Sequence, residues 1–163
     1  ELFLNGVSLG EKTRGEEDFH LMWRIPFVPG TLRAVAKDEK NTTLVREIKT
    51  AGPPAKIELS PDHAEIKADG FDLSFITVKV TDAEGNVVPD ADQTIYFDIQ
   101  GPGKIVGVDN GYQASHEPFK ANDRKAYHGL CLVVVQSLER PGEIVLTAKA
   151  EGLEGASVQI LCK

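Results

Sequence analysis

The stretch from residue 105 to residue 129 carries the densest set of side chains that could do chemistry. It reads IVGVDNGYQASHEPFKANDRKAYHG. Its acids, amide, imidazoles and guanidinium are Asp109, Asn110, His116, Glu117, Asp123, Arg124 and His128. Such groups serve hydrolases as general acids, bases and metal ligands. The stretch is either an active site or a long polar loop, and the spacing of its residues decides between the two.

A metal site is the first chemistry that this stretch could support. The candidate ligands are His116, Glu117, Asp123 and His128. Zinc sites normally show short, regular spacing such as HExxH on one helix face. Here the spacing is irregular, Pro118 and Gly129 interrupt it, and the calcium spacing of an EF-hand is absent. A surface loop that turns at Asp109-Asn110-Gly111 is favoured, and we expect neither metal nor cofactor.

Other catalytic arrangements also lack the spacing they need. A retaining glycosidase uses two carboxylates about 5–5.5 Å apart on a rigid scaffold. Most acids here stand in turn segments, where carboxylates usually cap backbone groups or face solvent: Asp38, Glu39, Asp82, Glu84, Asp90 and Asp92. No GxSxG pattern supports Ser115 or Ser137 as a nucleophile, and GxGxxG is absent. We therefore predict no catalytic residue.

Aromatic side chains could stack on a sugar. The candidates are Trp23, Phe27, Tyr96, Tyr112 and Tyr127. Trp23 shares an alternating face with Leu21 and Ile25, so core packing is favoured for it. Tyr96 and Tyr112 could be exposed, and they are the predicted carbohydrate contacts.

Composition excludes two classes of partner. The chain has 18 basic and 25 acidic residues and a net charge of −7, which disfavours nucleic-acid binding. The longest apolar run, Leu130 to Val135, is far shorter than the roughly 20 residues that span a bilayer, so we expect no membrane insertion. Hydrophobic residues make up 41%, enough for a packed core.

The elements that must position these residues read as strands and turns. Asn5-Gly6 predicts a two-residue hairpin turn. Residues 20–27 alternate as a strand does, and the run Leu130–Val135 is apolar on both faces, as in a covered central strand. About seven short strands after residue 57 predict a β-sandwich. The fold class is therefore all-β.

The segment Thr50-Ala51-Gly52-Pro53-Pro54-Ala55 predicts a domain boundary, because consecutive prolines cannot donate ladder hydrogen bonds. Residues 1–52 and 53–163 would form two immunoglobulin-like β-sandwich domains in tandem. An immunoglobulin-like domain takes about 100 residues. The first domain would therefore be partial and truncated at its N-terminus, cut from a longer polypeptide, with an exposed edge that invites association into a homo-oligomer.

Two cysteines, Cys131 and Cys162, are too few for a disulfide framework. Both stand in apolar strand patterns, which predicts buried free thiols. The cysteines leave the compartment undecided.

Several strings, taken in order, resemble one family. The most distinctive are LFLNG, WRIPFVPGTL, ADGFDLSF and VDNGYQASHEPFKANDRKA. They resemble the C-terminal region of bacterial glycoside hydrolase family 2 enzymes, mostly β-galactosidases, over nearly the whole chain.

The resemblance implies a division of labour. In that family the catalytic acid and nucleophile lie in an upstream (β/α)₈ barrel, so no catalytic residue carries over to this chain. The chain would form non-catalytic modules, inactive alone, that pack against the barrel and other domains of the same polypeptide. The parent would hydrolyse terminal β-galactosides with retention, in the periplasm or secreted.

Two other functions fit the residues. The string VTDAEGNVVPDA also suits the immunoglobulin-like modules of a bacterial surface adhesin. A carbohydrate-binding module that holds an oligosaccharide through exposed aromatics is the other.

The polar stretch itself is then predicted to be a fastened crossover. We expect a positive φ at Asn110 or Gly111, because the turn requires it. Phe119 and Ala126 should anchor the crossover to the sandwich. Arg124 should pair with a nearby acid, Asp109 or Glu117.

Overall fold

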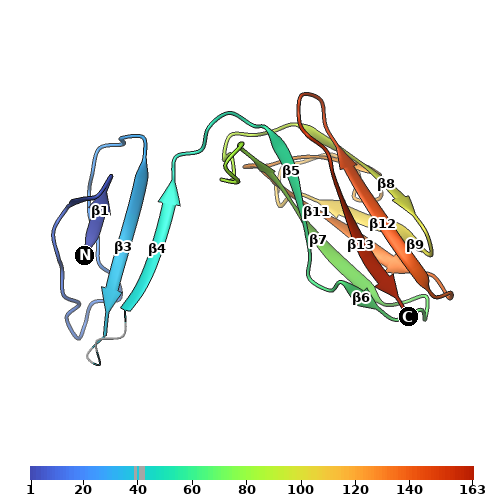
Figure 1. Ribbon diagram of the computed structural model, residues 1–163, viewed down its shortest axis with the longest axis horizontal. Helices are drawn as coiled ribbons and strands as arrows, with labels where there is room; N and C mark the ends of the chain where they lie inside the picture. The colour runs from blue at the N-terminus through green and yellow to red at the C-terminus, as the bar shows by residue number, and fades with distance from the viewer. Residues whose placement is uncertain (39, 41–42) are drawn as a thin grey trace. The chain divides into compact units, whose positions relative to one another are not determined.

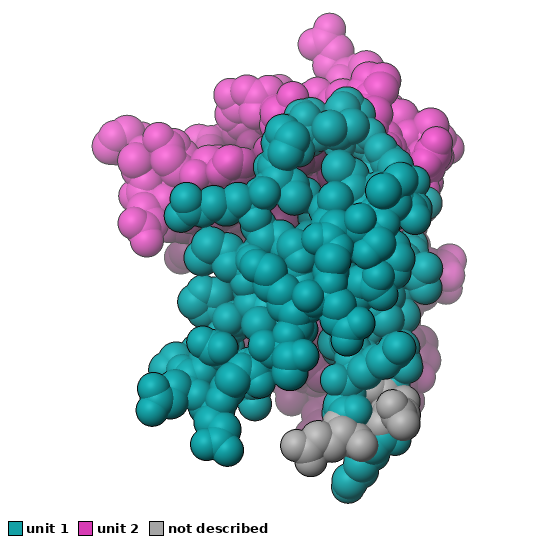
Figure 2. Space-filling model, turned by 90° about the vertical axis from the view of Figure 1, so that its left-hand side faces the viewer, with its two compact units in different colours: residues 1–50 teal, residues 51–163 magenta. Residues whose placement is uncertain are grey.

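The computed structural model describes residues 1–38, 40 and 43–163. Glu39 and part of the turn predicted over residues 38–42 lie outside this set. Throughout the described residues the chain is all-β, as predicted, and no helix long and apolar enough to cross a membrane occurs among them. The chain divides into two compact units, Glu1–Thr50 and Ala51–Lys163 (Figures 1 and 2). The division falls two residues before the boundary predicted after Gly52.

The first unit is one antiparallel sheet in the order β2-β1-β3-β4. Its strands are β1 (Leu2–Leu4), β2 (Val7–Ser8), β3 (Thr31–Lys37) and β4 (Thr43–Lys49). Asn5 and Gly6 take φ values of 51° and 80°, which confirms the predicted two-residue hairpin. The Asn5 side chain also accepts a hydrogen bond from Thr31 N at 2.8 Å, tying the turn to β3.

Residues 20–27 form no strand, contrary to the prediction. Their alternation is real, since Leu21, Trp23 and Ile25 are half-buried, but Phe27 is 81% exposed. Both edges of β3 are already paired, with β1 and with β4, so this segment has no ladder to join there. No described residue of the first unit is fully buried, and the predicted core packing of Trp23 is only partial.

The second unit is a two-layered β-sandwich (Figure 1). One sheet runs β5 (Lys56–Pro61), β7 (Leu73–Thr81), β11 (Leu130–Ser137) and β9 (Gly103–Asp109). The other runs β10 (Asp123–Lys125), β8 (Thr94–Gln100), β12 (Gly142–Lys149), β13 (Ala156–Cys162) and β6 (Glu65–Ile66). Neighbours are antiparallel except β13 and β6, which are parallel.

The core lies between these sheets and follows from period-two alternation. Its fully buried members include Ile76, Val78, Val133, Val135, Ile144, Leu146 and Ile160. β11 is central, as predicted, but only one of its faces is covered: Leu130 is 40% exposed, and Leu132 and Val134 are half-buried. The sheet β5-β7-β11-β9 therefore presents a partly apolar outer face.

Both cysteines are buried free thiols, which confirms that prediction. Cys131 lies on β11 and Cys162 on β13, in different sheets. Burial raises the pKa of the Cys131 thiol to about 12, so it is protonated and unreactive at neutral pH.

Candidate functional site: the crossover between β9 and β11

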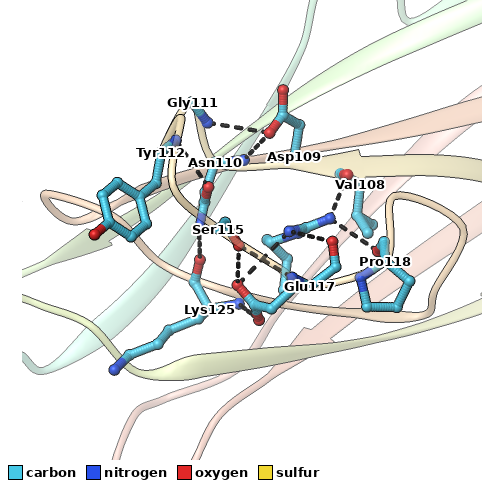
Figure 3. Close-up of polar contacts among 10 residues, drawn as sticks. Val108, Asp109, Asn110, Gly111, Tyr112, Ser115, Glu117, Pro118 and Lys125 are labelled. Atoms are coloured by element: carbon cyan, nitrogen blue, oxygen red, sulfur yellow. Dashed lines mark hydrogen bonds and ion pairs between the residues drawn. The ribbon is translucent and has the colours of Figure 1, made fainter.

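The polar stretch is a crossover that leaves the end of β9, passes through β10 in the opposite sheet and enters β11 (Figure 3). Its first turn is made by side chains that cap the backbone. Oδ1 of Asp109 accepts from the N–H groups of Asn110 and Gly111, at 2.7 and 3.2 Å. Asn110 in turn accepts from Tyr112 N at 3.0 Å. Gly111 has a φ of 72°, which confirms the predicted positive φ.

Arg124 is the centre of the crossover. It lies on β10, and among the described residues it is the largest of the fully buried side chains. Its Nη2 donates to the carbonyl oxygens of Val108 and Pro118 at 2.8 and 2.9 Å, which binds the end of β9 to the loop (Figure 3). A charged donor makes such bonds roughly twice as strong as neutral ones. The guanidinium thus replaces a strand partner for this irregular segment.

Glu117 completes the arrangement around the arginine. Its Oε2 lies 3.6 Å from Nη1 of Arg124, which confirms the predicted ion pair with an acid. The same carboxylate accepts from Ser115 Oγ at 3.1 Å and from Lys125 N at 3.2 Å. Asn110 Nδ2 donates to the Lys125 carbonyl at 2.9 Å. These bonds tie the loop to β10 at two points.

Of the two predicted hydrophobic anchors, one is confirmed and one is not. Ala126 is buried and anchors the crossover as expected. Phe119 is 65% exposed and does not anchor it, so that prediction is wrong. The physical reason is that the Arg124 guanidinium occupies the space beneath the loop, and the Phe119 ring lies over it at 5.5 Å.

The candidate metal ligands do not converge. Among the described residues no group of three or more His, Cys, Asp or Glu side chains is placed to hold a metal ion. His116 is exposed on the loop, Asp123 lies on β10, and His128 Nδ1 lies 3.1 Å from the Pro89 carbonyl. Because a carbonyl only accepts, Nδ1 of His128 carries a proton and is not available to a metal.

Of the predicted turn acids, Asp38 and Asp82 cap backbone N–H groups, whereas Asp92 forms an ion pair with Lys125 at 2.8 Å. Asp82 accepts from the N–H groups of Gly52, Glu84 and Asn86 at 2.8, 3.0 and 2.8 Å. Hydrogen bonds from the Asn86 side chain and from these backbone groups lower the pKa of Asp82 to about 2. Its carboxylate is therefore an ionised cap at neutral pH, with too low a pKa to act as a proton donor there.

The two predicted carbohydrate contacts lie on different elements. Tyr96, on β8, is 59% exposed, and Tyr112, in the loop after β9, is 47% exposed. Tyr112 stacks on Tyr127 with ring centroids 4.8 Å apart and an interplanar angle of 26°. Tyr127 then meets the His128 ring at 4.2 Å. The rings of Tyr112 and His128 therefore both contact the ring of Tyr127.

Tyr127 and His128 are not among the predicted carbohydrate contacts, although a local turn pattern in the sequence points to their position. His128 and Gly129 both have positive φ, 52° and 75°, and form a two-residue turn between Tyr127 and Leu130. The backbone groups of Tyr127 and Leu130 bond to each other in both directions, at 2.8 and 3.1 Å. A Tyr-His-Gly string before an apolar strand is the signal that places the Tyr127 ring.

A shallow groove of about 250 Å³ lies at the same end of the sheet. Its lining residues are Thr77, Asp109, Asn110, Gly111, Leu130, Cys131 and Leu132. The groove mixes hydroxyl, carboxylate and amide groups with leucine side chains. Such a surface can bind a small polar molecule that also has an apolar face.

Comparison with known proteins identifies the family. The profile of the glycoside hydrolase family 2 C-terminal domain 5 matches residues 57–159. The chain belongs to glycoside hydrolase family 2. A second profile, a domain of unknown function (DUF4982), matches residues 1–44. The family resemblance drawn from the motifs is thereby confirmed.

Individual family 2 relatives agree with this assignment. Beta-galactosidase BoGH2A of Bacteroides ovatus is 48% identical over 98% of this chain and 19% of its own length. A glycosyl hydrolase family 2 member from Bacteroides cellulosilyticus is 39% identical, with a TM-score of 0.90 over 99% of this chain and 21% of its own. A beta-glycosidase from Bacteroides vulgatus is 29% identical, with a TM-score of 0.92 over 98% and 20%. The chain thus spans about a fifth of the length of these relatives.

Proposed function

We propose that the chain forms non-catalytic accessory modules of a family 2 glycosidase that hydrolyses terminal β-galactosides with retention. The observation that carries the proposal is the profile match over residues 57–159, together with 48% identity to a beta-galactosidase of which the chain covers 19%. The contacts of the crossover support it, because Arg124, Glu117 and Asp109 all serve to fasten the loop. Side chains committed to such bonds stabilise a scaffold.

We propose further that the second unit is immunoglobulin-like. Its two sheets correspond to the ABED and CFG layers of that fold if β5, β7, β11 and β9 are taken as A, B, E and D. The parallel pairing of β6 with β13 then extends the second layer at its edge. This correspondence and the shared two-layer core support the assignment.

The first unit is, in this proposal, part of a sandwich completed by other strands of the polypeptide. A cavity of about 390 Å³ lies beside β3 and is lined in part by Leu2, Leu21, Trp23 and Val35. The Trp23 indole nitrogen is shielded from solvent without an acceptor among the described residues. Such a half-closed surface, which mixes these apolar side chains with charged ones, suits packing against a further layer.

A chromogenic substrate tests the proposed function. The isolated 163-residue chain should release no nitrophenol from 4-nitrophenyl β-D-galactopyranoside, whereas the full-length polypeptide should release it. Proton NMR of the first product should show the β-anomer, since retention preserves the configuration. Turnover by the isolated chain, or an initial α-anomer from the full-length enzyme, would contradict the proposal.

A further inference from the structure

Three aromatic rings form a small exposed surface, here called the tyrosine cluster: Tyr112, Tyr127 and His128. Tyr112 and Tyr127 are 47% and 38% exposed although they stack on each other at 4.8 Å. Figure 3 shows the Tyr112 ring directed away from the polar contacts of the loop. Since one face of Tyr112 is covered by Tyr127, its exposed surface includes the other face. An open aromatic face is a platform on which a flat apolar surface can stack.

The backbone holds these rings in place without a ligand. The Asn110 side chain caps Tyr112 N at 3.0 Å and is itself tied to the Lys125 carbonyl. His128 has a φ of 52°, an uncommon conformation for a residue other than glycine, and its ring bonds the Pro89 carbonyl at 3.1 Å. A surface fixed in advance loses little conformational entropy when it binds.

Polar acceptors stand next to the tyrosine cluster. Gly111, the neighbour of Tyr112, lines the groove that also contains Thr77, Asp109 and Leu130. Oδ1 of Asp109 is occupied by two backbone N–H groups. Among the described residues no donor bonds its Oδ2, which leaves that oxygen able to accept from a ligand hydroxyl. The groove lining includes one carboxylate and no cation.

We propose that the tyrosine cluster and this groove bind a neutral glycan. A pyranose has one face of C–H groups, which would stack on Tyr112, and hydroxyls at its edge, which would reach Asp109 Oδ2 and Thr77. The single carboxylate and the lack of a cation in the lining disfavour an acidic sugar, because like charges repel. The proposal rests on this surface alone and not on the activity of the full-length enzyme.

Affinity electrophoresis of the whole 163-residue chain tests the proposal. Native gels would contain soluble β-1,4-galactan or hydroxyethylcellulose as neutral probes, with polygalacturonate as the acidic one. The chain should be retarded by at least one neutral probe and not by polygalacturonate. Tyr112→Ala and Tyr127→Ala should each weaken retardation about tenfold, which corresponds to the loss of an aromatic contact of about 1.4 kcal/mol.

Matched variants separate the site from general effects. Tyr96→Ala removes another exposed tyrosine, on β8, and should leave retardation unchanged. Tyr112→Phe keeps the ring and should also bind. Equal thermal midpoints would show that each variant is folded. Retardation by neither neutral probe, equal loss in Tyr96→Ala, or stronger binding of polygalacturonate would overturn the proposal. The proposal would also be overturned if the tyrosine variants retained glycan binding but lowered the thermal stability of the full-length enzyme. The cluster would then be a domain interface.

Discussion

At the scale of single residues, the buried charge of Arg124 holds the crossover between β9 and β11 in place. Arg124 has no exposed surface, yet its guanidinium contacts three backbone carbonyls and the Glu117 carboxylate. A carbonyl at the end of β9 would otherwise be left without a donor in the interior, which is costly. The arginine therefore replaces hydrogen bonds that the irregular crossover does not supply.

Replacing Arg124 by Met tests this role. The free energy of unfolding should fall by about 2–4 kcal/mol, because the buried Val108 carbonyl and the Pro118 carbonyl lose their donor and the Glu117 carboxylate loses its ion-pair partner. Urea denaturation of the 163-residue chain measures the change. Lys125→Met is the matched control: Lys125 pairs with Asp92 at 2.8 Å, but both side chains are largely exposed, so the effect should be much smaller. Equal losses in the two variants would contradict the assigned role of Arg124.

The Asp82 cap predicts an acid-sensitive fold. The pKa of Asp82 is about 2 in the folded chain, below the ordinary value of 3.8. The ionised cap therefore contributes its full stability above pH 3.8, and this contribution is lost as the pH falls through about 2. The urea midpoint should drop over that range, with Asp62 and Asp69, whose pKa values are also lowered, adding to the slope.

The Asp82→Ala variant isolates the contribution of the cap to the pH profile. It should be less stable than the unsubstituted chain at pH 7, and the difference should shrink as the pH approaches 2. Asp90→Ala, at a neighbouring exposed turn, should keep the original pH profile. A constant difference between Asp82→Ala and the original chain at every pH would refute the proposed link to ionisation.

At the scale of elements, the sequence predicted correctly those features that depend on residues adjacent in the chain. The Asn5-Gly6 hairpin and the turn at Asp109-Asn110-Gly111 could both be predicted, because each depends on adjacent residues. Residues 20–27 were misread as a strand because a strand also needs a partner, which period-two alternation does not reveal. The Phe119 anchor was wrong because burial of Arg124 depends on carbonyls contributed by distant segments.

Two glycines test the turns at either end of the crossover. Gly111 and Gly129 have similar φ values, 72° and 75°, so alanine meets the same backbone strain of about 1–2 kcal/mol at both. A Cβ at Gly129 would lie 2.3 Å from the Val88 carbonyl oxygen, whereas at Gly111 nothing lies within 4 Å. Gly129→Ala should therefore lose a further 1–3 kcal/mol or so by urea denaturation. Equal losses would show that this contact is readily relieved.

At the scale of the whole molecule, the chain forms two β units and spans about a fifth of the length of its family 2 relatives. The second unit has a fully buried core between two sheets, whereas no described residue of the first unit is fully buried. Their stabilities should differ accordingly, since burial of apolar surface is the main stabilising term. Under the proposed function, such a pair would stabilise the parent enzyme and would not carry out its reaction.

Removal of these 163 residues from the full-length enzyme is the most direct test of that claim. Initial rates on 4-nitrophenyl β-D-galactopyranoside and the half-life of thermal inactivation would be measured on the intact and shortened proteins. For the protein that remains folded, kcat should be nearly unchanged, while the half-life at elevated temperature should shorten. A shortened enzyme that is folded and thermally stable, yet has lost its turnover, would show that this chain contributes to catalysis.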